Sequence, residues 1–144
     1  MAKTLSIKHF ADLTAEEFYD IARARETVFL LEQRIVCQDF DGVDKNAFHI
    51  TLKEDGKILA YLRIFNDGND TVIGRVLTTE RGRGYGLRIM AAAEEAALEN
   101  FPSRRIILHS QTQAIPFYER CGYTIISEEF LEEGVPHKMM EKIL

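Results

Sequence analysis

Hydrophobic and polar residues in the first third of the chain follow two different periods. Apolar and polar side chains alternate over residues 4–10, and this period of two predicts a short strand. Thr14 and Glu17 then have the spacing of a capping box, in which a hydroxyl and a carboxylate satisfy free amides at a helix start. Apolar residues at helical spacing predict that this helix runs to about Leu31. The irregular, acidic segment 32–46 predicts a loop.

The middle of the chain has the pattern of consecutive strands. The strands predicted there are 47–53, 57–66 and 71–79. The dipeptide Asp55-Gly56 between the first two suits the positive φ angles of a tight hairpin turn. Gly74 lies inside the third strand, where a glycine often marks a bulge or a close backbone approach.

The last part of the chain alternates helical and extended patterns. The alanine-rich run 86–101 predicts a helix, and Pro116 is compatible with a further short helix only in its first turn. The other predicted elements are a buried strand at 104–111, the short helix at 113–121, and strands at 123–130 and 137–144. Helices interleaved with mostly antiparallel strands predict an α+β fold, with a mixed sheet covered by helices.

Composition limits the domain count and the compartment. A chain of 144 residues that is 46% hydrophobic predicts a single domain, residues 1–144. The formal net charge of -5 argues against a nucleic-acid partner, so any anion site must be local. Cys37 and Cys121 fit a reducing compartment rather than a disulfide framework. No secretory pattern follows Met1 and no apolar run suits a membrane span, so a cytoplasmic protein without a membrane partner is expected.

The stretch ERGRGYGL, residues 80–87, places three glycines and two arginines between a strand and a helix. Free amides and the positive end of a helix favour an anion, so this turn predicts a phosphate site. A P-loop would need Gly-Lys-Ser/Thr before the helix, which is absent. A dinucleotide fingerprint starting at Gly82 would need a glycine where Leu87 stands.

The pattern Arg81-x-x-Gly84-x-Gly86 resembles the acetyl-CoA loop of the GNAT family of N-acetyltransferases. About 30 residues later, AIPFYERCGY matches that family's Ala-x-x-Phe-Tyr-x-x-x-Gly-aromatic segment. Two motifs in order are more specific than either alone. The segments RETVFLLEQ, QDFDGVD, VIGRV and EEGVPHKMM further resemble the ElaA-like branch of the family. The resemblance implies a mostly antiparallel, twisted sheet of 6–7 strands with a splayed central pair, flanked by 3–4 helices.

The resemblance also implies a set of coenzyme-binding residues. Residues that would contact acetyl-CoA are Arg75, Val76, Leu77, Thr78, Arg81, Gly82, Arg83, Gly84, Tyr85, Gly86, Leu87, Phe117 and Tyr118. Strand 75–78 would bind the pantetheine arm, and the amides of about 82–87 would bind the pyrophosphate, with charge from the arginines and from Arg88. An amide from Val76 or Leu77 would stabilise the oxyanion. Tyr118 would protonate the departing thiolate as a general acid.

The implied reaction transfers an acetyl group from acetyl-CoA to a primary amine in a ternary complex. A neutral amine is scarce at pH 7, so a general base is expected. His137 and Glu32 are the catalytic candidates for it, and Glu129 and His49 are further candidates. No metal is inferred, because the histidines and cysteines match no ligand spacing. Dimers are common in the resembling family, so a homodimer is a further expectation.

Two questions stay open at this level. Acidic residues in segments 32–46 and 128–133 would attract a cationic amine if both border the site. Arg25 and Arg63, in apolar contexts, indicate either buried ion pairs with the acidic loop or recognition of a substrate carboxylate. A different class of function, an acyl-CoA-binding sensor or scaffold without catalysis, also fits the motifs.

Overall fold

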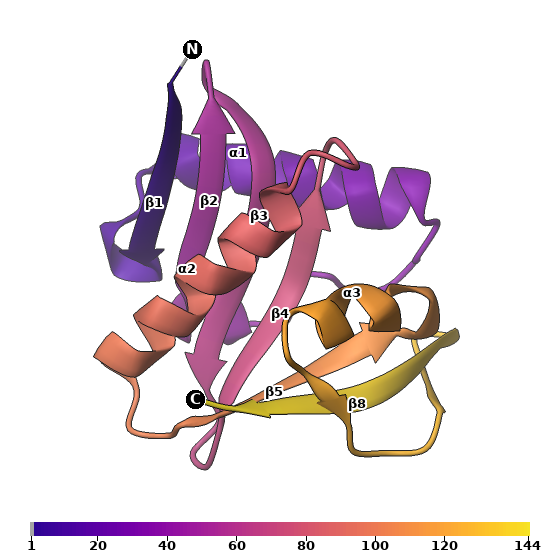
Figure 1. Ribbon diagram of the computed structural model, residues 1–144. Coiled ribbons are helices and arrows are strands. Elements are labelled where there is room, and N and C mark those ends of the chain that lie inside the picture. Colours follow the sequence, from indigo (N-terminus) through magenta and orange to yellow (C-terminus); the bar gives the residue numbers. More distant parts are fainter. Residues whose placement is uncertain (1) are drawn as a thin grey trace.

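The computed structural model describes residues 2–144, which contain eight strands and three α-helices (Figure 1). Met1, the first residue of the predicted domain, lies outside the described residues. The strands are β1 (Lys3–His9), β2 (Phe48–Glu54), β3 (Lys57–Asn66), β4 (Thr71–Thr78), β5 (Arg105–Gln111), β6 (Thr124–Ile125), β7 (Phe130–Glu132) and β8 (Val135–Ile143). The helices are α1 (Ala15–Arg25), α2 (Tyr85–Asn100) and α3 (Ile115–Arg120), with a π-helix, η2 (Glu26–Glu32), after α1. Short 3-10 turns are η1 (Phe10–Asp12), η3 (Val43–Asn46) and η4 (Thr112–Ala114).

The strands form one mixed sheet in the order β1-β2-β3-β4-β5-β8-β6, and β7 pairs with β8. Every pairing is antiparallel except that of β4 with β5. The predicted turn at Asp55-Gly56 joins β2 to β3, and the φ angles of its two residues are 52° and 77°. This confirms the hairpin, because a two-residue turn of this kind needs positive φ at both positions.

Helices cover both faces of the sheet (Figure 1). On one face, α2 and α3 contribute to the main core, in which Leu62, Ala93 and Leu108 are almost fully buried. On the other face, α1 and η2 cover β3 and β4. The smaller core there consists of Ile21, Val28, Ile58, Tyr61 and Leu77. The layered α+β fold and its three α-helices agree with the prediction.

The parallel pair in the centre of the sheet separates along its length. Paired residues of β4 and β5 are limited to Thr71 with Ile106 and Val72 with Ile107. Beyond Val72 the two strands diverge, and Figure 1 shows the opening between them widening toward α3. Each strand keeps its other neighbour, since β4 pairs with β3 and β5 pairs with β8 over their lengths. The expected splayed central pair is therefore present.

The predicted helix that ends near Leu31 changes its hydrogen bonding after α1. The Thr27 hydroxyl donates to the carbonyl oxygen of Arg23 at 2.9 Å, and that carbonyl would accept the Thr27 amide in an α-helix. The chain continues in the wider turns of η2, and the Gln33 amide donates to the Val28 carbonyl at 3.0 Å. Hydrophobic spacing does not separate the two helix types, so the sequence predicts one continuous helix.

The segment 123–130 forms two short strands instead of the one predicted, which brings the sheet to eight strands rather than six or seven. The hydroxyl of Ser127 accepts a hydrogen bond from the Met139 amide at 2.8 Å, so a side chain replaces a backbone carbonyl in the ladder with β8. The strand pattern is interrupted there, and β7 starts three residues later.

The first turn of α2 packs directly against α3, and this contact generates a stability prediction. A Cβ atom on Gly86 would lie 2.9 Å from Cζ of Phe117, closer than ordinary contact. Gly86→Ala is expected to lower the free energy of unfolding by about 1–3 kcal/mol through overpacking, measured by urea denaturation.

Phe117→Leu supplies the control, since it removes the ring that the new methyl group meets. In that background the penalty of Gly86→Ala should shrink. An equal penalty in both backgrounds would contradict overpacking as the cause.

Candidate active site

The glycine-rich turn links β4 to α2 with a run of free amides. Gly82 and Gly84 have φ angles of 72° and 77°, in the left-handed region that favours glycine. Gly84 is the N-cap of α2 and supplies no side-chain cap, and the first amide bonded back to it belongs to Arg88, at 3.2 Å. Within residues 2–144, no backbone hydrogen bond is donated by residues 80–87. This turn can therefore present several amides to one anion at a helix N-terminus.

A bulge in β4 lies on the same side of the opening as the glycine-rich turn. Tyr61 of β3 pairs with Leu77, whereas Arg63 pairs with Gly74, so two β4 residues oppose one β3 residue. Within this bulge Arg75 has a φ of 55°, which is unfavourable for a residue with a side chain. The bulge expected near Gly74 is confirmed. It redirects the edge of β4 at the point where β5 has already diverged.

Tyr118 lies on α3 beside the opening, with its ring buried against Phe117 and Tyr123. Burial raises the pKa of Tyr118 above its usual range, and the nearby Cys121 adds to this rise. The phenol therefore stays protonated at neutral pH.

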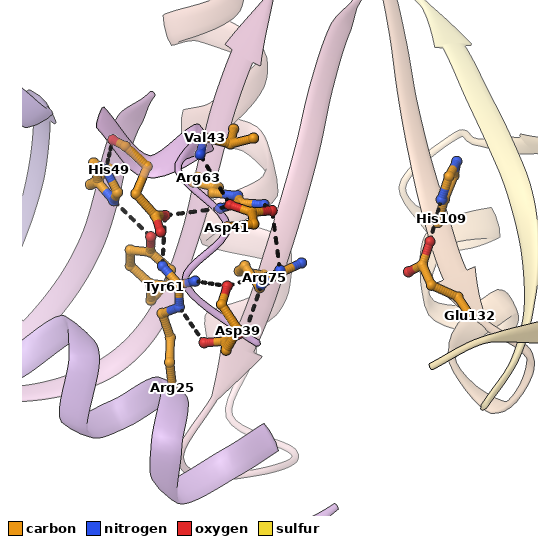
Figure 2. Close-up of polar contacts among 11 residues, drawn as sticks. Arg25, Asp39, Asp41, Val43, His49, Tyr61, Arg63, Arg75, His109 and Glu132 are labelled. Carbon is orange, nitrogen blue, oxygen red and sulfur yellow. Dashed lines mark hydrogen bonds and ion pairs between the residues drawn. The ribbon is translucent and has the colours of Figure 1, made fainter. Parts of the chain in front are cut away.

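Three arginines and three aspartates fasten the acidic loop to the sheet (Figure 2). We call these six residues the Arg–Asp network. Its contacts are Arg25 Nη1 to Asp44 Oδ1 (2.7 Å), Arg25 Nε to Asp39 Oδ2 (2.8 Å), Arg63 Nη2 to Asp41 Oδ2 (2.9 Å), Arg63 Nη1 to Asp44 Oδ1 (3.0 Å) and Arg75 Nε to Asp39 Oδ1 (2.7 Å). Arg25 and Arg63 thus form buried ion pairs with the loop, which decides the question that the sequence left open.

The arginines lower the pKa of two of the aspartates. Hydrogen bonds from Arg63 lower the pKa of Asp41 to about 2. Burial alone would raise the pKa of Asp44, but hydrogen bonds and charge from Arg25 and Arg63 outweigh burial and lower it. The network is therefore charge-balanced at neutral pH, and its three carboxylates leave no excess negative charge for a substrate.

Imidazole and carboxylate groups lie across the opening from Arg75 (Figure 2). His109 Nδ1 of β5 is 2.8 Å from Glu132 Oε1 of β7, and His137 Nε2 of β8 is 3.7 Å from Glu132 Oε2. We call these three residues the His109 cluster. The hydrogen bond with His109 lowers the pKa of Glu132, to which the charges of His137 and Arg75 contribute. The two walls are thus near enough to interact electrostatically.

A side-chain bridge joins η2 to the β5 wall. Gln111 is the last residue of β5, and its Nε2 donates to Oε1 of Gln33 at 2.9 Å. Gln33 follows the last turn of η2. The bridge therefore ties the end of β5 to the segment that follows η2.

The predicted base candidates occupy different places. His137 is buried, and its Nδ1 lies 2.7 Å from the Val135 carbonyl oxygen. Glu32 is exposed at the end of η2, and Glu129 is exposed between β6 and β7. His49 is in the interior, within 2.7 Å of the Tyr61 hydroxyl and 2.9 Å of the Asp44 carbonyl oxygen, so it supports the acidic loop rather than the opening.

Among the described residues, no group of three or more histidine, cysteine, aspartate or glutamate side chains could hold a metal ion. None of the helices in residues 2–144 is both long and apolar enough to cross a membrane.

Comparison with known proteins identifies the family. The model of the acetyltransferase (GNAT) domain matches residues 8–144, nearly the whole chain. The chain belongs to the GNAT family. ElaA of Escherichia coli is 31% identical over 136 residues, covering 90% of this chain and 89% of ElaA, and its crystal structure superposes with a TM-score of 0.91. That likeness places the protein in the ElaA-like branch of the family.

Two further similarities extend across kingdoms and to a second crystal structure. A UPF0039 protein of Schizosaccharomyces pombe is 37% identical over 138 residues, 92% of each chain. The crystal structure of an acyl-CoA N-acyltransferase from Pseudomonas aeruginosa has a TM-score of 0.90 and 32% identity, covering 98% of this chain and 99% of that one. The protein is thus a CoA-binding GNAT acyltransferase.

The GNAT fold brings most of the predicted coenzyme residues to one side of the opening. The bulged part of β4, the turn before α2 and the start of α3 meet there, and Phe117 contacts the first turn of α2 at Gly86. Glu32 is not part of this group. Sequence reasoning did not assign His109 to the site or Arg75 to an ion network. A histidine directly after the apolar run 106–108 of this strand is the one local signal for His109.

Asp44 is the acidic centre of the network in this GNAT protein, because it binds both buried arginines. Asp44→Asn is expected to lower the free energy of unfolding by about 3 kcal/mol, since it removes the one carboxylate that the two buried guanidinium groups share. Urea denaturation at neutral pH measures this loss.

Asp70→Asn is the matched control, because Asp70 pairs with a half-exposed arginine, Arg105, at 3.3 Å. Its loss should be below about 1 kcal/mol. Equal losses of unfolding free energy for the two variants would contradict a stabilising role of the Arg–Asp network.

Proposed function

We propose that this GNAT protein transfers an acetyl group from acetyl-CoA to a primary amine, by direct attack of the amine while both substrates are bound. The observation that carries the proposal is the opening between β4 and β5. One end of it meets the free amides before α2, and its other face lies between the Arg–Asp network and the His109 cluster. A thioester in this opening would have a coenzyme side and an acceptor side.

The coenzyme side suits a long, anionic molecule with an extended arm. Amides of residues 82–87 are available to a pyrophosphate, and the exposed arginines Arg81 and Arg83 add positive charge. The edge of β4 over residues 75–78 lacks a β5 partner, so a pantetheine arm can bond to it as an added strand would. These features support acetyl-CoA as the donor.

The transfer needs a hydrogen-bond donor for the oxyanion and an acid for the sulfur. We assign the donor to an amide of the bulge, from Val76 or Leu77, because a bulge can aim an amide out of the strand ladder. We assign the acid to Tyr118, whose burial keeps it protonated. The amine nitrogen forms a bond with the carbonyl carbon, the carbon–sulfur bond breaks, and Tyr118 gives its proton to the sulfur.

Thiol release tests the proposal directly. Acetyl-CoA is mixed with the protein and with a panel of primary amines that includes an alkylamine, a polyamine and a peptide with a free N-terminus. Free thiol should appear only when protein, acetyl-CoA and an accepted amine are all present, and mass spectrometry should find one acetyl group added to that amine. Saturable binding of acetyl-CoA without acetylation of any amine would instead support a non-catalytic acyl-CoA sensor.

Tyr118→Phe is expected to lower kcat about 10²-fold, because it removes the proton of the proposed acid and keeps the ring. The dissociation constant for acetyl-CoA, measured by calorimetry, should change little.

Tyr123→Phe is the matched control, since the Tyr123 hydroxyl donates to Glu94 at 3.1 Å. It is expected to leave kcat within about threefold of wild type. Equal kcat for Tyr118→Phe and wild type would remove Tyr118 from the chemistry.

A further inference from the structure

An amine acceptor arrives mostly as an ammonium ion at neutral pH, because a primary amine has a pKa near 10. It must lose a proton before its nitrogen can attack. The following inference rests on the proposed function, and it concerns the group that removes this proton and the charge of the acceptor.

Charge on the acceptor side is unevenly distributed. In the Arg–Asp network three guanidinium groups face three carboxylates, so that wall is neutral as a whole. On the other wall Glu132 has a lowered pKa and is ionised, and Glu133 follows it at the turn into β8. The excess charge beside the opening is therefore negative on the β5 side, which favours a cationic acceptor.

His109 has the position of a base for such an acceptor. Side chains of β5 alternate, so Ile106 and Leu108 are in the core under α2 whereas His109 is on the opposite face. Its side chain is 40% exposed. The next residue on that face, Gln111, bonds to Gln33 of η2. The imidazole therefore lies on the face of β5 opposite α2, which is the acceptor side. It is next to the part of β5 that no longer pairs with β4.

The orientation of the ring leaves one nitrogen free. His109 Nδ1 is 2.8 Å from Glu132 Oε1, and an ionised carboxylate can only accept, so Nδ1 carries the hydrogen. Phe130 packs edge-on against the ring, with centroids 5.1 Å apart. The remaining nitrogen, Nε2, then has a free lone pair, which is the arrangement of a carboxylate-oriented histidine base.

We propose that His109 is the general base that takes a proton from a cationic primary amine, and that Glu132 is the positioning residue that fixes its tautomer and attracts the ammonium group.

Protons balance as follows. The ammonium ion loses one proton to His109 Nε2, which passes it to solvent, and the neutral nitrogen attacks the thioester carbon. As the carbon–sulfur bond breaks, the nitrogen loses a second proton, again through His109, and the sulfur gains one from Tyr118. Tyr118 regains its proton from solvent. The net products are the acetylated amine, free coenzyme A thiol and one released proton.

His137 and Glu32 are less suited to this role. His137 is buried, its Nδ1 contacts the Val135 carbonyl oxygen, and its Nε2 lies on the Glu132 side at 3.7 Å, so the ring faces Glu132 from the interior. Glu32 is exposed at the end of η2. His137 is better described as a second partner that holds Glu132 in place.

Several other titratable and charged groups face Glu132 from neighbouring elements. His137 of β8 lies on the other side of Glu132, and Arg75 of β4 acts on Glu132 from across the opening. Cys37, in the acidic loop, is near enough to interact with Glu132, Glu133 and Arg75.

His109→Gln tests the proposal in the full-length protein, with the amine that the wild type acetylates. The variant should lose about 10²-fold in kcat/KM at neutral pH. It should also lose the ascending limb that a base gives to the profile of kcat/KM against pH. Calorimetry should find unchanged acetyl-CoA affinity, which shows that the variant is folded.

Two histidine variants are controls. His9→Gln alters a histidine at the far edge of the sheet, on β1, and should keep the wild-type profile. His137→Gln should keep the ascending limb. Loss of that limb in His137→Gln, or a His109→Gln protein with wild-type kcat/KM at every pH, overturns the assignment to His109. A wild-type protein that binds acetyl-CoA but acetylates no amine overturns the proposed function and this inference together.

Glu132→Gln supplies a readout other than activity. NMR of the His109 ring nitrogens should show the neutral ring protonated at Nδ1 in wild type and a mixture of both tautomers in the variant, because a glutamine can donate to Nδ1 as well as accept from it. The kcat/KM for the cationic amine should fall in the same variant, because the charge that attracts the ammonium group is gone. A tautomer unchanged by the substitution, or an unchanged kcat/KM, would overturn the role of Glu132.

Discussion

Two parallel residue pairs, at the start of β4 and β5, are the constraint on which the rest of the structure depends. They hold the strands together at one end, while β3 and β8 hold them apart at the other through complete antiparallel ladders. A sheet normally satisfies its interior backbone groups by pairing neighbours. Here the facing edges are left free in the centre of the molecule, and an extended ligand can occupy them without entering the core.

The bulge and the Arg–Asp network make this opening asymmetric. Arg75 has an unfavourable backbone conformation, and its ion pair with Asp39 offsets part of that cost. The same aspartate binds Arg25 of α1, so one loop connects the helix layer to the bulged strand. Because the network is neutral, it can fix the shape of the β4 wall without deciding the charge of the acceptor. We propose that the opposite wall decides that charge.

Local sequence signals predicted the elements that depend on neighbouring residues. The capping box at Thr14, the turn at Asp55-Gly56 and the bulge near Gly74 all follow from a few adjacent positions. Glycines that must adopt a left-handed conformation, such as Gly84, are likewise readable. Family resemblance then supplied the splayed pair, which no local pattern encodes.

Contacts that depend on register between distant segments were not predictable in this way. His109 meets Glu132 only because β5, β8 and β7 align over 23 positions of separation. The π-helical turns of η2 are another example, because hydrophobic spacing does not distinguish them from α-helical turns. In the sequence, neither His109 in its apolar strand nor Arg75 after Gly74 indicates a functional site. Their positions beside the opening become evident only in the folded structure.

Hydrogen exchange with and without saturating acetyl-CoA, followed by mass spectrometry, tests the central claim most directly. Amides on the free edge of β4 between Gly74 and Thr78, and amides of residues 80–87, should exchange more slowly with the ligand, because it bonds to strand-edge and loop amides that have no partner without it. The β1–β2 hairpin edge should not change. Unchanged exchange in β4 and the loop, or protection confined to the α1 face, would contradict the account.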